Sequence, residues 1–475
     1  MIKTGNSERK LLFFFLISAL VLKMFTFFYS VIDIDESTYL IIGKEVFNGK
    51  WLYVDYYDTK PPGIFLIFGL IEYLTGKGIF FSRLVASLLV GLTAFLLYKL
   101  KFQLSGNSRA SIFTGLAYLI LASMYRFTFA ANTEVFFIFF TIWAFYIFFT
   151  GTKNSQFFIG GLIAGLGFMI KYVVAFDMLA YGLLLVFLVL KGRMKFLEML
   201  KTGALILAGL LLPLAAVTLV YLSIGQFDAL FRFSFGFLMN YGQSSQVNNY
   251  GAFLLDIHLK YLPAFMFFYF LLFQNIKSML KEPFSFFKLA WVVMVFLSIF
   301  LLKRENTHYF MQLFPVMAFV LGDLFIIPNR PGSYILKHKT GFVFWGLGLL
   351  LITNLVNQSY YIFREDRPAR IAVYLEKHMN EDDLIYISGY KHIIYYLLDQ
   401  SPPTPFVHPT LFAYKHHIES LDIDTKSEIE KVLVQKPEFI IYRIDTYLHT
   451  WEEYFFRKYK KMKEFDGEVF VYRRL

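Results

Sequence analysis

The chain has 475 residues, of which 57% are apolar, 20% are aromatic and only 17% are charged, and its mean hydropathy is +0.53. This composition excludes a soluble globular protein and favours a polytopic α-helical membrane protein. The lack of cysteine excludes disulfides and thiolate metal sites. The net charge is +11, and the basic residues cluster in alternate loops. This pattern indicates loops on the cytoplasmic side of a membrane rather than nucleic-acid binding.

Hydrophobic stretches long enough to cross a hydrocarbon core of about 30 Å recur from Leu11 to Tyr360. The first stretch, from Leu11 to Ser30, has no small-residue cleavage site after it, so we interpret it as an uncleaved span. With the basic clusters placed inside, the chain is predicted to cross the inner (cytoplasmic) membrane about 11 times. The N-terminus is then cytoplasmic and the C-terminus extracytoplasmic. The clusters assigned to the inside are Lys3/Arg9/Lys10, Lys99/Lys101/Arg109, Lys153, Lys191/Arg193/Lys195/Lys201, Lys277/Lys281/Lys288 and Arg330/Lys337/Lys339.

The apolar segment from Gly63 to Leu74 is only about half as long as a span. We interpret it as an interfacial helix in the first outer loop, residues 31–81. Counting it as a span would place the later basic clusters outside, against the positive-inside bias. Residues 1–360 are therefore predicted to form one transmembrane catalytic domain.

After Tyr360 the sequence changes to a mixed pattern of charged, apolar and proline residues. The alternation of helical and strand periods predicts a small extracytoplasmic α/β domain over residues 361–475. The predicted elements are helices at Pro368–His378, Lys391–Leu398 and Ser427–Val434 and strands at Leu384–Ser388 and Phe439–Tyr442.

The first outer loop combines an acidic start, Asp33-Ile-Asp35-Glu36, with the later Lys60-Pro61-Pro62. A carboxylate beside the membrane suits a general base for an acceptor hydroxyl, and a lysine before a rigid Pro-Pro turn can hold a phosphate. The structural alternative is that the acids cap a helix from Ser37 to Phe47 and that the lysine merely reaches water at the interface. Spacing alone leaves both interpretations open.

A second polar group lies between two hydrophobic stretches, at residues 303–310, and includes Arg304, His308 and Tyr309. The predicted topology places it outside, where an arginine and a histidine at a helix mouth suit a lipid phosphate. A solvated turn with extended side chains is the alternative.

Three further candidates are Asp58 in the first outer loop and, near predicted outer helix ends, Glu134 and Lys171. Structural pairing explains the last two equally well. The aspartates of the first loop could bind a divalent cation, but their loose spacing gives this little support. We therefore predict no obligatory metal or other cofactor.

Asp35-Glu36, the Lys60-Pro61-Pro62 stretch, and His308-Tyr309 with Pro315 resemble the motifs of GT-C membrane glycosyltransferases. The pattern is most similar to protein O-mannosyltransferases and aminoarabinose (lipid A) transferases. The resemblance covers the membrane portion, where Arg83 follows the Lys-Pro-Pro stretch.

The resemblance implies transfer of a hexose or pentose from an undecaprenyl- or dolichyl-phosphate donor to an extracytoplasmic acceptor, with inversion. The acceptor could be a protein hydroxyl, a lipid or a cell-surface glycan. By the same resemblance, Asp35 is the catalytic base with Glu36 beside it, and Lys60 binds the donor phosphate. Arg304, His308 and Tyr309 contact the phosphate or orient the acceptor, and Arg83 is a second-tier candidate with the three residues above.

The competing function is a transporter or flippase of an anionic lipid-linked substrate. Such sites lie near the membrane midplane, between related repeats. Here the polar groups occur at predicted outer helix ends and no repeat relates the two halves. The expected partners are therefore the lipid donor, its acceptor and membrane lipids, with no nucleic acid.

Overall fold

A computed structural model of the chain describes residues 6–236, 249–302, 306–326, 338–413, 415–443 and 457–475. Contacts divide the chain into two compact units, each built from three segments. The first unit contains Met1–Phe27, Arg83–Leu219 and Gln246–Ile362, and the second contains Phe28–Ser82, Val220–Ser245 and Phe363–Leu475. The first outer loop thus groups with the C-terminal segment.

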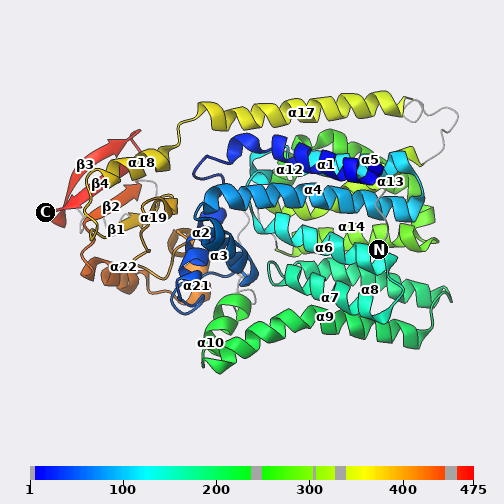
Figure 1. The fold of residues 1–475 in the computed structure, drawn as a ribbon, viewed down its shortest axis with the longest axis horizontal. Coiled ribbons are helices and arrows are strands. Elements are labelled where there is room, and N and C mark those ends of the chain that lie inside the picture. Colours follow the sequence, from blue (N-terminus) through cyan, green and yellow to red (C-terminus); the bar gives the residue numbers. More distant parts are fainter. Residues whose placement is uncertain (1–5, 237–248, 303–305, 327–337, 414, 444–456) are drawn as a thin grey trace. The chain divides into compact units, whose positions relative to one another are not determined.

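The first unit is a bundle of helices (Figure 1). Its helices are α1 (Asn6–Val21), α4 (Gly78–Ser105), α5 (Ser108–Leu121), α6 (Thr133–Thr150), α7 (Asn154–Phe168), α8 (Val174–Leu190), α9 (Phe196–Ser223), α12 (Tyr250–Lys260), α13 (Leu262–Met279), α14 (Pro283–Leu302), α15 (Leu313–Leu321) and α17 (Lys339–Phe363). The first residues of α4 and the last residues of α9 and α17 belong to the second unit. Short 3-10 turns are η1 (Met24–Thr26), η2 (Arg126–Thr128), η4 (Thr307–Gln312) and η5 (Gly322–Phe325).

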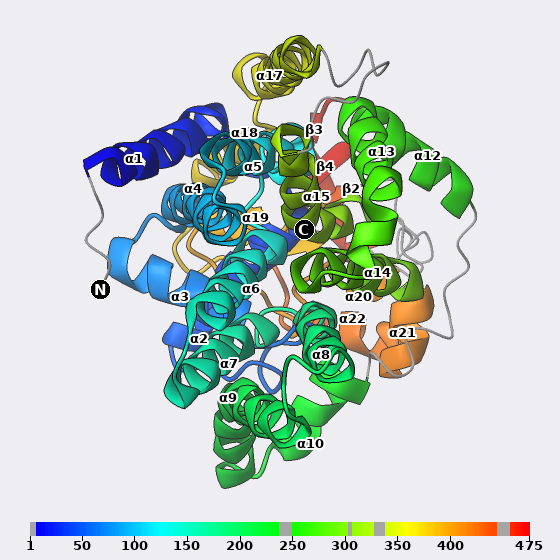
Figure 2. The same ribbon diagram turned by 90° about the vertical axis from the view of Figure 1, so that its right-hand side faces the viewer.

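Five helical stretches of the described chain are long and apolar enough to cross a membrane, or six if the bent pair α12 and α13 forms one span. The apolar helices α3 (Gly63–Thr75), α5 and α8 are shorter than 18 residues. The multi-pass character is therefore confirmed, whereas the count of 11 spans stays a prediction. Figure 2 shows α9 and α17 at the rim of the bundle. Only 11% of the apolar window of α9 is buried, against 83% for Thr307–Phe325, so α9 presents most of its leucines to lipid.

The second unit combines short helices with one four-stranded sheet (Figure 1). The sheet order is β1-β2-β4-β3, with β1 and β2 parallel and the other two pairs antiparallel. Its helices are α2 (Ile34–Phe47), α3 (Gly63–Thr75), α10 (Phe227–Leu230), the π-helical η3 (Phe231–Gly236), α18 (Arg367–Glu376), α19 (Ile393–Leu397), α20 (Thr410–Ala413), α21 (Lys415–Leu421) and α22 (Thr425–Val434). Its strands are β1 (Ile385–Ser388), β2 (Phe439–Arg443), β3 (Tyr459–Phe465) and β4 (Val469–Arg474).

The predicted elements of the C-terminal segment are confirmed as α18, β1, α19, α22 and β2, each shifted by at most a few residues. Strands β3 and β4 were not predicted. Strand β3 lies at the edge of the sheet, and its five middle residues are exposed. Because most of these residues are charged, the sequence lacks the alternation of apolar and polar residues by which a strand is predicted. The extracytoplasmic location of this segment stays a prediction.

The segment interpreted as interfacial is a helix of 13 residues, α3, which packs against α2. The two helices approach closely where Gly43 faces Gly69. A Cβ atom on Gly43 would lie 2.6 Å from the backbone nitrogen of Gly69 and from the backbone oxygen of Phe65. No side chain fits there, so this contact sets the position of the helix that begins at Ile34.

We expect Gly43→Ala to destabilise the protein by about 1–3 kcal/mol, because the added methyl group must push two backbones apart. Thermal unfolding of the purified protein in detergent measures the effect. Gly182→Ala in α8 is the matched control, since a Cβ atom there meets nothing within 4 Å. Equal melting temperatures for the two variants would show that the α2 and α3 contact is not tight.

Candidate active site

The acidic start of the first outer loop forms the N-terminus of α2. Asp33 is the N-cap residue, and its side chain accepts a hydrogen bond from the backbone N–H of Asp35 at 3.0 Å. Asp33 is therefore a helix cap, as the structural alternative predicted. Asp35 and Glu36 lie in the first helical turn, where the helix dipole favours carboxylates, and Glu36 is buried.

Lys60 reaches Asp35 from the loop before α3. Its Nζ lies 3.6 Å from Asp35 Oδ2 and 3.6 Å from Asp58 Oδ1, and 5.2 Å from the ring centroid of Tyr39. The Lys60 backbone is held on both sides, because its N–H donates to Asp58 and its carbonyl accepts from the Tyr53 hydroxyl. Tyr53 is fully buried at φ +65°, a strained conformation for a residue with a side chain. These contacts therefore fix the loop in the conformation that holds the Lys60 side chain beside Asp35.

A histidine from the C-terminal segment completes the surroundings of Asp35. His408 Nε2 lies 2.8 Å from Asp35 Oδ1, and the Tyr39 hydroxyl donates to Asp35 Oδ2 at 3.3 Å. On the other side of the imidazole, the backbone N–H of Thr410 donates to Nδ1 at 3.3 Å. Since Nδ1 accepts this bond, Nε2 carries the hydrogen and donates it to the carboxylate.

A second histidine of the same segment contacts α2 one turn further on. His392 Nε2 lies 2.8 Å from the Thr38 hydroxyl, and its ring centroid lies 5.8 Å from that of His408. Burial, together with the neighbouring His408 and Lys391, holds the pKa of His392 well below its usual range. The His392 imidazole is therefore neutral at physiological pH and adds no charge beside Asp35.

The structure thus brings together three of the predicted residues, Asp35, Asp58 and Lys60, within the second unit. Sequence reasoning missed His408 and His392, which lie more than 350 positions away along the chain. The available signal was weak: His408 follows a proline-rich stretch at Pro402, Pro403 and Pro405. Prolines restrict the backbone beside this histidine, which indicates that its side chain is fixed in position but does not identify the residue it contacts.

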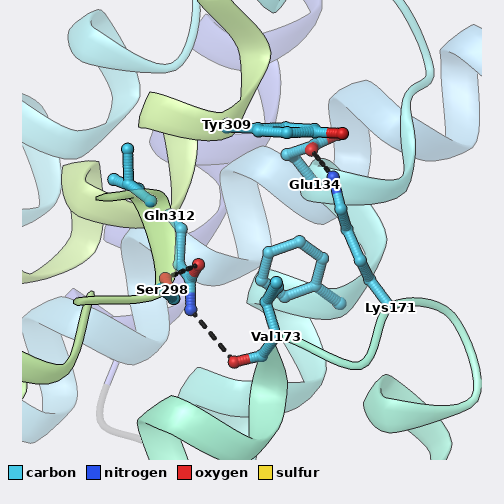
Figure 3. A pocket seen from close by; sticks show the side chains of 8 residues that line it. Glu134, Lys171, Val173, Ser298, Tyr309 and Gln312 are labelled. Atoms are coloured by element: carbon cyan, nitrogen blue, oxygen red, sulfur yellow. Dashed lines mark hydrogen bonds and ion pairs between the residues drawn. The ribbon is translucent and has the colours of Figure 1, made fainter. Parts of the chain in front are cut away.

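A separate polar cluster lies in the first unit at the start of α6 (Figure 3). Glu134, whose side chain is 1% exposed, forms an ion pair with Lys171. His308 Nε2 lies 4.0 Å from Glu134 Oε1, and the Lys171 Nζ lies 4.0 Å from the ring centroid of Tyr309. Four predicted residues from three parts of the chain therefore meet here, and Glu134 and Lys171 pair as the structural interpretation expected.

A buried hydrogen-bond network lies beside this cluster. Its members Val173, Ser298 and Gln312 line a small pocket together with Glu134, Lys171 and Tyr309 (Figure 3). The Gln312 amide nitrogen donates to Asp177 Oδ2 at 2.8 Å and to the Val173 carbonyl at 3.3 Å, and its oxygen accepts from the Ser298 hydroxyl at 2.8 Å. The Trp291 indole N–H donates to Asp177 Oδ1 at 2.7 Å. Gln312 thus joins the turn after Lys171 to the turn that carries His308 and Tyr309.

The two remaining predicted residues are Arg83 and Arg304. Arg83 is 1% exposed in the first unit and donates a hydrogen bond to the Thr26 carbonyl at 2.6 Å. Arg304 lies outside the described residues. Within the described parts of the chain, no three histidine or acidic side chains gather so as to hold a metal ion.

Comparison with known proteins defines the class of this fold. Residues 59–221 match the family model of dolichyl-phosphate-mannose-protein mannosyltransferase. A crystal structure of the Archaeoglobus fulgidus oligosaccharyltransferase is 11% identical and has a TM-score of 0.51, with 98% of this chain and 73% of that chain covered. The resemblance to GT-C membrane glycosyltransferases is confirmed, and the chain has their fold.

A more extensive likeness is to ArnT from Cupriavidus metallidurans, whose crystal structure was determined with undecaprenyl phosphate bound. It is 14% identical, its TM-score is 0.71, and the match covers 98% of both chains. An uncharacterized protein of Aquifex aeolicus is 23% identical over 362 residues, which are 73% of this chain and 69% of that protein. The likeness to ArnT extends over both compact units.

Proposed function

We propose that the chain is a glycosyltransferase that moves a sugar from a polyprenyl-phosphate donor to an acceptor hydroxyl, with inversion at the anomeric carbon. The observation that carries the proposal is the Asp35 carboxylate held between the Lys60 ammonium at 3.6 Å and the His408 imidazole at 2.8 Å. The match to the mannosyltransferase family model and the ArnT-like fold support it.

Asp35 acts as the general base. It takes the proton of the acceptor hydroxyl while the hydroxyl oxygen attacks the anomeric carbon from the face opposite the phosphate. The bond between the anomeric carbon and the phosphate oxygen breaks, and its electron pair stays on that oxygen. The products are the glycosylated acceptor, a protonated Asp35 and polyprenyl phosphate. A base placed in this way typically contributes a factor of about 10²–10⁴ to the rate.

Lys60 stabilises the negative charge that develops on the leaving phosphate. This charge grows in the transition state, so a fixed cation lowers the barrier more than it strengthens ground-state binding. The fixed backbone of the loop before α3 makes Lys60 such a cation, because little reorganisation is needed when the charge appears.

We assign the cluster of Glu134, Lys171, His308 and Tyr309 to recognition of the lipid-phosphate donor. Glu134 keeps the Lys171 ammonium in place and neutralises it while no anion is bound. A histidine that can donate a hydrogen bond and an aromatic ring beside the lysine suit an anionic sugar phosphate. The donor already carries an activated leaving group, so the reaction needs no nucleotide.

We further propose that the chain lies in the inner membrane, with the N-terminus cytoplasmic and the C-terminal domain extracytoplasmic. Polyprenyl-phosphate sugars suit a compartment without nucleotide sugars. The acceptor is a protein hydroxyl, a lipid or a cell-surface glycan, and no obligatory metal takes part.

The test is sugar transfer from a panel of radiolabelled polyprenyl-phosphate sugars by membranes that contain equal amounts of wild type, Lys60→Ala or Lys77→Ala. We expect transfer by the wild type from one donor and a loss of about 100-fold in Lys60→Ala, the size expected for removing one transition-state donor. Lys77→Ala is the control, because Lys77 is an exposed lysine beyond the C-terminus of α3.

Transfer by none of the donors, with extracts added as a source of acceptor, would contradict the proposal. It would favour transport of a lipid-linked anion instead. Full activity in Lys60→Ala would keep the enzyme class but remove Lys60 from the phosphate site.

A further inference from the structure

We propose that His408 is a positioning residue, by which the C-terminal segment fixes the Asp35 carboxylate as a charged base in the orientation that catalysis requires. The inference rests on the proposed function, since it concerns how the base of that reaction is prepared. The juxtaposition that carries it is the hydrogen bond from His408 Nε2 to Asp35 Oδ1, made across 373 positions of the chain.

The surroundings of His408 fix its role as a donor. Thr410 contacts Nδ1 twice, through its backbone N–H at 3.3 Å and its hydroxyl at 2.7 Å. The Thr410 carbonyl in turn accepts a hydrogen bond from His417 Nδ1 at 3.0 Å. With Nδ1 occupied as an acceptor, the ring presents Nε2–H to Asp35, and the imidazole cannot relay a proton without breaking the bond from the Thr410 N–H.

The segment that carries His408 is docked on the first outer loop immediately before the histidine. The backbone N–H of Tyr57 donates to the Pro405 carbonyl at 2.8 Å. The Tyr57 ring lies edge-on to Phe406, with centroids 4.9 Å apart, and stacks on Phe233 at 4.4 Å. Helix α19 also packs against α2 (Figure 1). The histidine therefore arrives on a fixed backbone, as a precise hydrogen bond requires.

The direction of the effect follows from the charges around the carboxylate. A hydrogen bond to a charged group typically stabilises the charged form by a factor of about 10–100. Without the His408 donor, Asp35 becomes protonated at higher pH, and a protonated base is inactive. Among the described residues, the charged and titratable groups around Asp35 include Asp33, Glu36 and Tyr39 on or beside its helix, Asp58 and Lys60 in the loop, and Lys391, His392 and His408 in the C-terminal segment.

The test compares the pH dependence of kcat for sugar transfer by wild type, His408→Ala and His408→Gln. We expect the acid limb of the profile to move up by about one pH unit in His408→Ala, the shift that corresponds to a tenfold change in the carboxylate's protonation equilibrium. In His408→Gln the limb should lie close to that of wild type, because an amide N–H can replace Nε2–H. His378→Ala is the matched control, since His378 is an exposed histidine in the turn after α18.

A loss of activity in His408→Ala with an unchanged acid limb, and no rescue in His408→Gln, would overturn the inference and indicate a merely structural role. A second measurement does not depend on activity. Thermal unfolding of Asp35→Ala, His408→Ala and the double variant in detergent should give melting-temperature shifts that are not additive, because each single variant removes the same contact. Additive shifts would overturn the inference even if the wild type transferred no sugar, an outcome that would separately refute the proposed function.

Discussion

Replacing Asp35 by asparagine is expected to lower the rate of sugar transfer about 10³-fold while the binding of polyprenyl phosphate stays within about twofold of wild type. Asparagine preserves the shape of the side chain, and its amide oxygen can still accept the hydrogen bond from His408. It cannot take a proton from the acceptor hydroxyl. The measurement is the initial rate of transfer at saturating donor, together with binding of a labelled polyprenyl phosphate to the same membranes.

Asp55→Asn is the matched control for this experiment. Asp55 lies in the same loop, is exposed, and accepts a hydrogen bond from the backbone N–H of Trp51 at 2.6 Å. Its variant should therefore transfer sugar at close to the wild-type rate. If Asp35→Asn kept more than about a tenth of the activity, another group would have to be the base, since general-base catalysis is worth at least about 10²-fold. Glu36, the next carboxylate of α2, would be the first to examine.

Replacing Lys171 by methionine is expected to weaken donor binding by about 10–100-fold, the usual worth of a charge-assisted hydrogen bond to a phosphate. It should also lower stability, because Glu134 is 1% exposed and would become a buried carboxylate without its lysine. The double variant Lys171→Met/Glu134→Gln separates the two effects. It removes both charges, so it should regain stability but not donor binding.

Lys99→Met is the control that shows whether the loss of another ion pair in the same unit also weakens donor binding. Lys99 pairs with Glu8 at 2.9 Å in the same unit and is partly buried, like Lys171. We expect this variant to bind donor normally. Donor affinities are read from the titration of transfer rate against donor, and stabilities from thermal unfolding in detergent. Recovery of donor binding in the double variant would show that Lys171 serves only to neutralise Glu134.

Much of the fold could be predicted because its signals are local. Apolar length predicts membrane helices, and the short strands β1 and β2 stand out as isolated apolar runs. The edge strand β3 could not be found in this way, because its sequence Tyr-Lys-Lys-Met-Lys-Glu-Phe carries four charges. Such charges protect an unpaired edge from association and at the same time erase the strand pattern.

The candidate site could be predicted only where its residues are close along the chain. Asp35 and Lys60 lie in one loop, and their chemistry is visible in the motif. His408 could not be paired with Asp35 because the contact depends on tertiary docking. Gln312 and Asp177 each interrupt an apolar run, which indicates a buried polar group, but the sequence does not say that the two side chains meet 135 positions apart.

The three-segment construction of the second unit has a consequence for biosynthesis. Residues Phe28–Ser82 are made early, whereas their partners from Phe363 onward are made about 280 residues later. At typical elongation rates of about 5–20 residues per second, roughly 15–60 seconds pass before the partners exist. During this time Thr38, whose hydroxyl contacts His392 in the finished protein, and Tyr57, whose ring packs on Phe406, lack these partners. The second unit can therefore be completed only after the C-terminal segment has been made.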